Sequence, residues 1–245
     1  MINKIFRIIR QPQTELMSFY NQLSRFKKLD SLKRFPINKE DLYPCLNDNT
    51  NSTNFDAHYI YHPAWAARIV KKIDPEFHID ISSTLHFCTL LSAFIPVKFY
   101  DYRPAILSLN NLVSGKADLT NLLFKDNSVS CVSCMHTIEH IGLGRYGDEL
   151  DPDGDIKAIN ELKRICKPGG NILFVVPVGK PLLRFNAHRI YSPKIILDYF
   201  AGFELLDFSL VTDNGTFVSP SEIKLGDQQD YGCGCFWFKK LNDCS

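Results

Sequence analysis

The stretch "DIKAINELKRICKPGGNILFVVPVG", residues 155–179, decides the fold. Its first half places apolar residues at helical spacing, and Asp155 stands where a helix cap is expected. These apolar residues are Ile156, Ile159, Leu162 and Cys166. The Pro-Gly-Gly at 168–170 then ends the helix. Residues 171–179 are almost continuously apolar over the length of one strand, as in parallel strands buried on both faces.

The same alternation of helix and strand patterns continues on both sides of this stretch. Helical patterns cover residues 61–73 and 85–94, and strand patterns cover 76–81, 97–102 and 128–135. Alternation of this kind predicts βαβ units and a parallel sheet. The last two strand patterns, residues 203–211 and 233–241, have no helical pattern between them. They are therefore expected to run antiparallel to each other.

Composition indicates an ordinary globular protein with one main domain. The chain has 245 residues, 45% hydrophobic and 22% charged, with a net charge of +1. This balance does not favour nucleic acid as a partner. Apolar runs fall short of the roughly 20 residues that span a bilayer, and the N-terminus lacks a secretory pattern, so we expect a cytoplasmic protein. The eight scattered cysteines are predicted to be reduced thiols.

The N-terminal part differs in charge from the rest. Residues 1–40 hold nine lysines and arginines against three acidic residues. Apolar side chains at helical spacing in this arm are Ile2, Ile5, Phe6 and Ile9. Such a helix either packs on the protein with a solvated basic face or contacts a membrane surface or a partner. Residues 33–58 show no periodicity, so we expect residues 1–57 to be a helical extension and linker, and residues 58–245 the main domain.

Acidic residues follow three of the predicted strands. Asp80 closes the first strand, Asp101 closes the second 21 residues later, and Asp118 follows the third. Ligands of open parallel sheets bind outside the carboxyl ends of the strands. A carboxylate about 20 residues after the first turn is where the ribose of a nucleotide is held through its hydroxyls.

The order of these residues, with "HTIEH" (136–140) and "AINELKRICKPGGNILFVVPV" (158–178), resembles the class I methyltransferases that use S-adenosylmethionine. More narrowly, residues 133–170 and 176–193 resemble the family of domain of unknown function 268. The resemblance covers roughly residues 58–240. It implies a Rossmann-like α/β domain with a seven-stranded, mostly parallel sheet and helices on both faces.

The resemblance also assigns cofactor contacts. It implies Asp80 near the amino group and methionine portion of S-adenosylmethionine, Asp101 on the ribose hydroxyls, and Asp118 with the Leu119 backbone at the adenine. In the D-x-G-x-G turn of the family, Ser82 and Thr84 replace both glycines. A side chain there narrows the cleft, although the Ser82 hydroxyl can itself donate a hydrogen bond to the cofactor.

"HTIEH" also matches H-x-x-E-H, the inverted zinc-protease signature. That site needs His136, Glu139 and His140 on one long helix, whereas Gly142 and Gly144 follow at once. The preceding cysteines, three residues apart, point to opposite faces of a strand. We therefore predict no metal ion, and we assign His136 and Glu139 to the acceptor substrate. The alternative is that the histidines only satisfy buried hydrogen bonds.

Two segments are candidates for holding the acceptor. Residues 142–155 form a glycine-rich loop over the cleft, from which Arg145 and Tyr146 reach the acceptor. An EF-hand interpretation of this loop fails because its twelfth position is Asn160, and a plain surface loop is the other alternative. Residues 179–192 contribute Lys180, Arg184, His188, Arg189 and Tyr191. Such a set suits an anionic acceptor, unless Arg189 and Tyr191 only anchor the segment.

These observations support one leading hypothesis and one alternative. The leading hypothesis is a methyltransferase for a small or sugar-like acceptor, with His140 or His188 accepting the proton of its hydroxyl. The alternative is a methyltransferase-like binding module that has lost the cofactor through Ser82 and Thr84 and recognises an anionic or phosphorylated ligand.

Overall fold

The computed structural model describes residues 2–242, with side chains from residue 13 onward. The chain divides into two compact units, Met1–Asn54 and Phe55–Ser245. The first unit contains helix α1 (Ile2–Leu29) and the short 3₁₀ helix η1 (Lys39–Asp41). The side chains of the predicted apolar face at residues 2–9, and Cys244, lie outside the described part. Among the described residues, no helix is both long and apolar enough to cross a bilayer.

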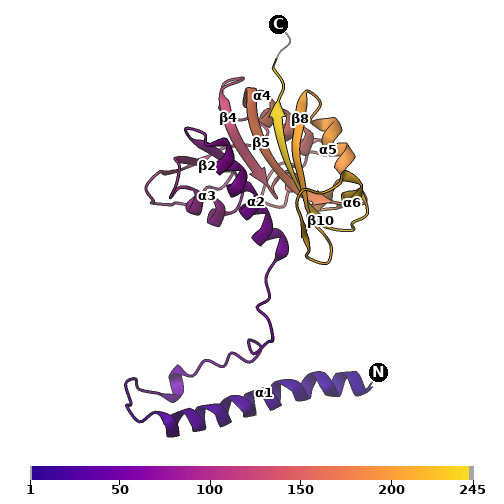
Figure 1. The fold of residues 1–245 in the computed structure, drawn as a ribbon. Coiled ribbons are helices and arrows are strands. Elements are labelled where there is room, and N and C mark those ends of the chain that lie inside the picture. The colour runs from indigo at the N-terminus through magenta and orange to yellow at the C-terminus, as the bar shows by residue number, and fades with distance from the viewer. Residues whose placement is uncertain (1, 243–245) are drawn as a thin grey trace. The chain divides into compact units, whose positions relative to one another are not determined.

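The second unit is built on one eight-stranded sheet in the order β3-β2-β1-β4-β5-β10-β8-β9 (Figure 1). Its strands are β1 (His78–Ile81), β2 (Val97–Asp101), β3 (Leu112–Lys116), β4 (Val129–Met135), β5 (Cys166–Val178), β8 (Phe203–Val211), β9 (Phe217–Val218) and β10 (Gly232–Lys240). Strands β1 to β5 pair in parallel. Strand β10 is antiparallel to both β5 and β8, which confirms the predicted pairing of the last two long strands.

The expected count of seven strands is wrong by one. The eighth strand, β9, is two residues long and pairs with the end of β8 after a turn at Thr212–Thr216. Gly215 takes the left-handed conformation in that turn, with φ of 79°. Two residues are too few to produce an alternating pattern, so the sequence showed only a loop there. A separate hairpin pairs β6 (Leu182–Arg184) with β7 (His188–Ile190).

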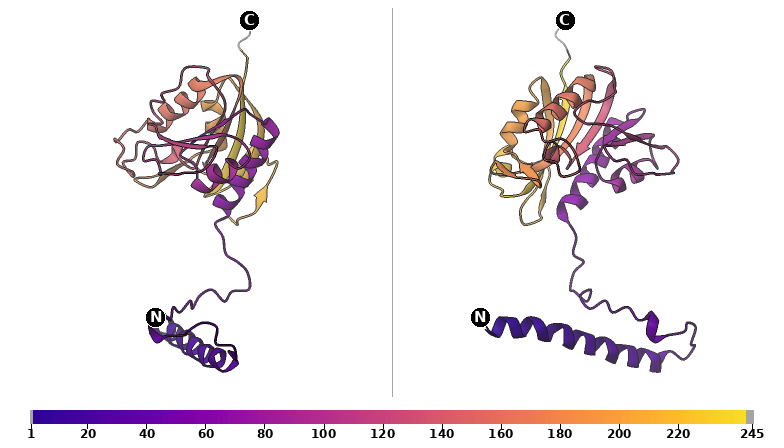
Figure 2. Two further views of the ribbon diagram at one scale, coloured as in Figure 1. Left: turned by 90° about the vertical axis from the view of Figure 1, so that its left-hand side faces the viewer. Right: turned by 180° about the vertical axis from the view of Figure 1, so that it is seen from behind.

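Helices cover both faces of the sheet (Figure 2). Helices α2 (Ala57–Ile73) and α3 (Leu85–Leu91) bury their apolar side chains on one face. Helices α4 (Gly154–Ile165) and α5 (Pro193–Tyr199) do so on the other, and the short α6 (Ile223–Asp227) packs beside α5. As predicted, Cys131 and Cys134 point to opposite faces of β4, one into each core. All seven cysteines among the described residues are free thiols.

The segment around residues 155–179 departs from prediction in two details. Helix α4 starts at Gly154, and Asp153 at its N-cap makes no capping hydrogen bond through its side chain. Asp155 is not a cap either: it is 4% exposed and accepts a hydrogen bond from the Tyr191 hydroxyl at 2.8 Å. Strand β5 already begins at Cys166, because residues 167–170 form a bulge between its pairings with Val129 and Cys131.

Candidate functional site

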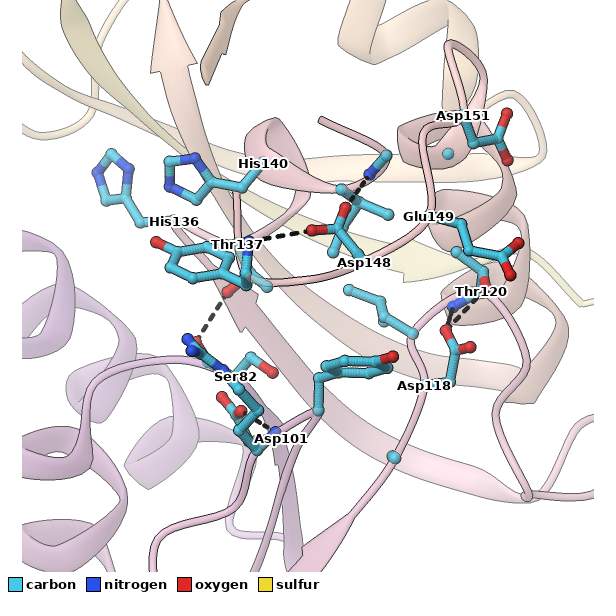
Figure 3. Close-up of a pocket in the computed structure, with 18 residues that line it drawn as sticks. Ser82, Asp101, Asp118, Thr120, His136, Thr137, His140, Asp148, Glu149 and Asp151 are labelled. Atoms are coloured by element: carbon cyan, nitrogen blue, oxygen red, sulfur yellow. Dashed lines mark hydrogen bonds between the residues drawn. The ribbon is translucent and has the colours of Figure 1, made fainter. Parts of the chain in front are cut away.

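A cavity of about 540 Å³ opens at the carboxyl ends of the parallel strands (Figure 3). This is the size and the place at which open α/β sheets bind small ligands. Its walls are formed by the segments that follow β1, β2, β3 and β4 and by the loop before α4. The lining residues are Ser82, Asp101, Tyr102, Arg103, Ala117, Asp118, Leu119, Thr120, His136, Thr137, His140, Ile141, Gly142, Tyr146, Asp148, Glu149, Asp151 and Gly154.

The turn after β1 keeps the shape of a glycine turn without its glycines. Ser82 has φ of 56°, the left-handed conformation that glycine adopts readily. Its hydroxyl donates to the Tyr100 carbonyl at 3.3 Å, and its own carbonyl accepts from the Thr137 hydroxyl at 2.8 Å. Thr84 is the N-cap of α3 and accepts the Phe87 N–H at 3.2 Å, so it does not line the cavity. The two substitutions therefore leave the cavity open.

Two carboxylates stand at the ends of the next strands. Asp101 ends β2, and its Oδ1 accepts the Arg103 N–H at 2.7 Å. Asp118 follows β3, and its Oδ1 accepts both the N–H and the hydroxyl of Thr120, at 2.8 and 2.7 Å. In each case the second oxygen has no hydrogen-bond partner among the described residues. Both side chains are thus fixed in orientation and keep one oxygen for a ligand.

The loop between η2 (Ile138–His140) and α4 closes one side of the cavity. Asp148 folds this loop by accepting the N–H groups of Gly142, Gly144 and Tyr146, at 2.8, 3.3 and 3.1 Å. Burial raises the pKa of Asp148, but these backbone donors outweigh it and lower the pKa below its usual value. The Tyr146 ring meets the Arg103 guanidinium at 4.8 Å, which links the loop to the end of β2 across the cavity mouth.

His140 is held as one tautomer. Its Nδ1 lies 2.6 Å from the Ala187 carbonyl, which can only accept, so Nδ1 carries a proton. Its Nε2 is then the basic nitrogen of the neutral ring. The buried Glu139 carboxylate lies 3.8 Å from Nε2, close enough to stabilise the ring once Nε2 is protonated. Arg145 does not line the cavity; it also donates to the Ala187 carbonyl, at 3.1 Å.

His136, at the end of β4, lies in a cluster of imidazoles on the α2 side of the sheet. Its Nδ1 is 2.9 Å from Glu139 Oε1, while its Nε2 has no hydrogen-bond partner among the described side chains and backbone groups. His58 of α2 stacks on it with ring centroids 5.4 Å apart. Burial, and then the charge of His136, lower the pKa of His58 to about 4, so this ring is neutral. The Cys233 thiol of β10 completes a group with His58 and His136 whose ligand atoms lie within 4.8 Å of one another.

The electrostatics around His136 favour positive charge. Burial by itself lowers the pKa of His136, but the Cys233 sulfur and the Glu139 carboxylate raise it to about 10. His136 also has φ of 54°, an uncommon conformation for a residue other than glycine. Two further polar atoms in the neighbourhood, His62 Nε2 and Glu139 Oε2, are buried without a hydrogen-bond partner in the described structure.

Asp80 lies under the cavity rather than in its wall. It is 0% exposed, and its Oδ1 accepts the Ser133 hydroxyl at 2.5 Å. The same hydroxyl lies 2.8 Å from His78 Nε2. Burial raises the pKa of Asp80 to about 7 and lowers that of His78 to about 3. The chain of three side chains is therefore a buried network that is neutral between the two pKa values and begins to ionise at Asp80 near pH 7.

The structure brings together only part of the residues proposed from the sequence. Those lining the cavity are Ser82, Asp101, Asp118, Leu119, His136, His140 and Tyr146. Those outside the lining are Asp80, Glu139, Arg145, Arg184, His188, Arg189 and Tyr191. Arg189 donates to the carbonyls of Ile141 and Pro152, and Tyr191 to Asp155, so both anchor the segment. His188 is half-buried against the Tyr231 ring, with centroids 4.9 Å apart, and Arg184 is exposed.

Sequence reasoning missed His58 and Cys233. His58 and His62 are four residues apart, so they share one face of α2, and this spacing was a signal available in the sequence. Cys233 gave no comparable signal, because its closeness to His136 depends on β10 and β4 flanking β5 in the sheet. Tyr102 and Arg103 also line the cavity. They directly follow Asp101, so their position after a strand could have predicted them in the same way.

The order of the strands, the antiparallel β10 between β5 and β8, and the cavity at the strand ends define a methyltransferase-like Rossmann fold. Solved structures agree. A putative methyltransferase from Bacillus halodurans is 14% identical, with a TM-score of 0.51 over 72% of this chain and 99% of that one. The 1,6-didemethyltoxoflavin-N1-methyltransferase of Burkholderia thailandensis, solved with S-adenosylhomocysteine, is 11% identical, with a TM-score of 0.52 over 74% and 79%. The resemblance to class I methyltransferases is confirmed at the level of the fold.

Sequence comparison confirms the narrower resemblance. Residues 119–229 match the family model described as "Caenorhabditis protein of unknown function, DUF268". An uncharacterised protein of Methanocaldococcus jannaschii is 31% identical over 113 residues, which make up 44% of this chain and 43% of that protein. The chain thus aligns with less than half the length of this curated relative.

Proposed function

We propose that the protein is an S-adenosylmethionine-dependent methyltransferase acting on a small-molecule acceptor. The observation that carries the proposal is the meeting of Ser82, Asp101 and Asp118, from three successive strand ends, in one cavity with His140. The bound cofactor would supply an electrophilic methyl group. Asp101 Oδ2 would accept hydrogen bonds from the ribose hydroxyls, and the buried Leu119 next to Asp118 offers an apolar contact to the adenine ring.

The charge of the cavity wall supports a cationic rather than an anionic ligand. The wall contains five carboxylates against two cationic side chains, Arg103 and His136 with its raised pKa. S-adenosylmethionine carries a sulfonium, so a wall of this sign lowers the energy of the bound cofactor. The cationic side chains that the sequence predicts for an anionic ligand do not converge: Lys180 pairs with Asp230 at 3.2 Å, and Arg189 donates to backbone carbonyls. This argues against the alternative of a module for phosphorylated ligands.

His140 is the residue we propose as proton acceptor. Its Nδ1 is bound to the Ala187 carbonyl, so Nε2 has the lone pair that takes the proton of an acceptor hydroxyl. Glu139 then stabilises the resulting imidazolium from 3.8 Å. Beyond this proton, methyl transfer requires positioning of the two reactants more than covalent participation of the protein.

Calorimetric titration with S-adenosylhomocysteine tests the proposal. The wild-type protein should bind one equivalent. Asp101→Ala should weaken binding about ten- to hundredfold, because a charged acceptor of hydrogen bonds contributes roughly 1.5–3 kcal/mol. Asp198→Ala, an exposed aspartate of α5 outside the cavity wall, is the matched control and should bind as the wild type does.

Two results would contradict the proposal: no binding at millimolar ligand, or equal binding by the Asp101 and Asp198 variants. With an acceptor in hand, His140→Gln should lower kcat by about 10²–10⁴-fold while leaving the affinity for S-adenosylhomocysteine within about threefold. Equal kcat values would instead remove His140 from the reaction.

A further inference from the structure

We propose that His58, His136 and Cys233 form a binding site for a transition-metal ion, with zinc as the expected occupant. The ligand atoms of the three residues lie within 4.8 Å of one another. They come from the start of α2, the end of β4 and the start of β10. The site is separate from the proposed cofactor contacts and does not depend on the methyltransferase proposal.

The unpartnered nitrogen of His136 points to a missing ligand. His136 is 8% exposed, and its Nε2 has no hydrogen-bond partner within the part of the chain that the structure describes. A buried polar atom left without a partner costs roughly 1–3 kcal/mol, and native proteins rarely tolerate it. The His58 ring and the Cys233 thiol lie beside this imidazole, with the ligand atoms of all three residues within 4.8 Å of one another. A metal ion that displaces the protons of His136 Nε2 and of the Cys233 thiol into solvent would satisfy all three groups at once.

Glu139 prepares His136 for this role. The carboxylate accepts the proton on His136 Nδ1 at 2.9 Å and is itself 1% exposed. This bond orients the ring, so that Nε2 presents its lone pair away from Glu139 once metal binding has displaced the Nε2 proton. Metal-binding histidines are commonly held by a carboxylate at the second ring nitrogen in this way, which also makes them better ligands.

The chemistry of the three side chains selects the ion. One thiolate and two imidazoles suit Zn²⁺ and related ions, whereas Ca²⁺ and Mg²⁺ prefer oxygen ligands. Three protein ligands leave one position of a tetrahedral ion open. His136 borders both this group and the proposed cofactor cavity, so the ion would lie next to the place of the acceptor.

The site differs from the zinc-protease interpretation of "HTIEH". That interpretation needs a long helix, whereas residues 138–140 form a single 3₁₀ turn. Glu139 and His140 are not ligands in the site proposed here. The partners of His136 are instead 78 residues before it and 97 residues after it in the chain.

Titration of the reduced, chelator-treated protein with Co²⁺ tests the proposal, since cobalt reports its ligands by absorption. We expect one equivalent of Co²⁺ to bind, a cobalt–thiolate charge-transfer band to appear, and Zn²⁺ to displace the cobalt. Cys233→Ser should lose the band, and His58→Gln and His136→Gln should weaken binding. Glu139→Gln should weaken it about 10- to 100-fold while keeping the band, as an orienting residue does.

Matched controls separate ligation from general damage. Cys88→Ser removes another fully buried cysteine of the same core, and His86→Gln removes an exposed histidine of α3. Both should bind Co²⁺ like the wild type, and circular dichroism checks the fold of every variant. The proposal is overturned if the wild type shows no saturable binding of Co²⁺ or Zn²⁺, or binds Co²⁺ without a thiolate band. Retention of the band in folded Cys233→Ser would equally overturn it, and the wild-type titration decides even if a variant fails to fold.

Discussion

Replacing Asp80 with asparagine should change how the stability of the protein depends on pH. Asp80 is fully buried, its Oδ1 accepts the Ser133 hydroxyl, and its Oδ2 has no hydrogen-bond partner in the geometry of the described residues. Burial raises its pKa from an ordinary value of 3.8 to about 7. Between these two values the folded protein keeps the carboxyl protonated and the unfolded chain does not. The free energy of unfolding therefore falls as pH rises through this window.

The size of the effect follows from the shift. Each unit of pKa difference corresponds to about 1.4 kcal/mol, so the full window is worth roughly 4 kcal/mol, of which about 2–3 kcal/mol falls between pH 5 and 8. Asparagine does not titrate, so the variant loses none of this free energy of unfolding as pH rises. Its amide has a different fit beside Ser133, which shifts the stability of the variant by a constant amount at every pH. The pH dependence of the difference between variant and wild type therefore reports the carboxyl alone, because the constant difference cancels.

Urea unfolding of wild type and Asp80→Asn at pH 5, 6, 7 and 8 measures this change. The free energy of unfolding of the variant, relative to wild type, should increase by about 2–3 kcal/mol from pH 5 to 8. The exposed Asp198→Asn should show no such increase. A difference between Asp80→Asn and wild type that stays constant within about 0.5 kcal/mol would refute the reasoning, because Asp80 would then titrate alike in the folded and unfolded states.

Two further substitutions test the walls of the cavity and the segment beside it. Gly142→Ala should weaken binding of S-adenosylhomocysteine and lower Tm, because the added Cβ would lie 2.0 Å from a backbone carbonyl oxygen of the loop. The control is Gly147→Ala, because Gly147 has a similar φ of 85° but open space around it. Equal effects of the two would show that backbone conformation alone is responsible. Tyr191→Phe should lower the free energy of unfolding by about 1–3 kcal/mol in urea, since Asp155 loses a buried donor; no loss would mean that Arg189, 3.5 Å away, satisfies it alone.

The fold was largely predictable because its signals are local and repeated. The helix and strand patterns around residues 155–179 and the alternation before them gave the parallel sheet, and the absence of a helical pattern between the last two long strands gave their antiparallel pairing. Signals that depend on very few residues were lost. Strand β9 and the hairpin of β6 and β7 are each only two or three residues per strand. The placement of Asp155 under Tyr191, instead of at a helix cap, depends on tertiary packing.

The candidate site was predictable to the extent that it follows strand ends. Asp101 and Asp118 line the cavity because parallel strands present their carboxyl ends at one edge. Residue type alone did not show whether Ser82 and Thr84 would narrow the cavity. The answer depends on the left-handed backbone of Ser82 and on the role of Thr84 as the N-cap of α3. The spacing of His58 and His62 indicates a shared face of α2, but which residues lie against that face depends on the neighbours that each element finds in the sheet.

The cluster of His58, His136 and Cys233 combines residues from inside and outside the segment that matches the family model. Residues 119–229 match the family model, and of the three proposed ligands only His136 falls inside that segment. His58 precedes it and Cys233 follows it. A relative recognised through this segment alone can therefore share the loop and the helix α4 without the proposed metal ligands His58 and Cys233. Two sequence features would divide such relatives into those with and those without the proposed ligand set. The features are a histidine near the start of the first domain helix and a cysteine at the start of the last strand.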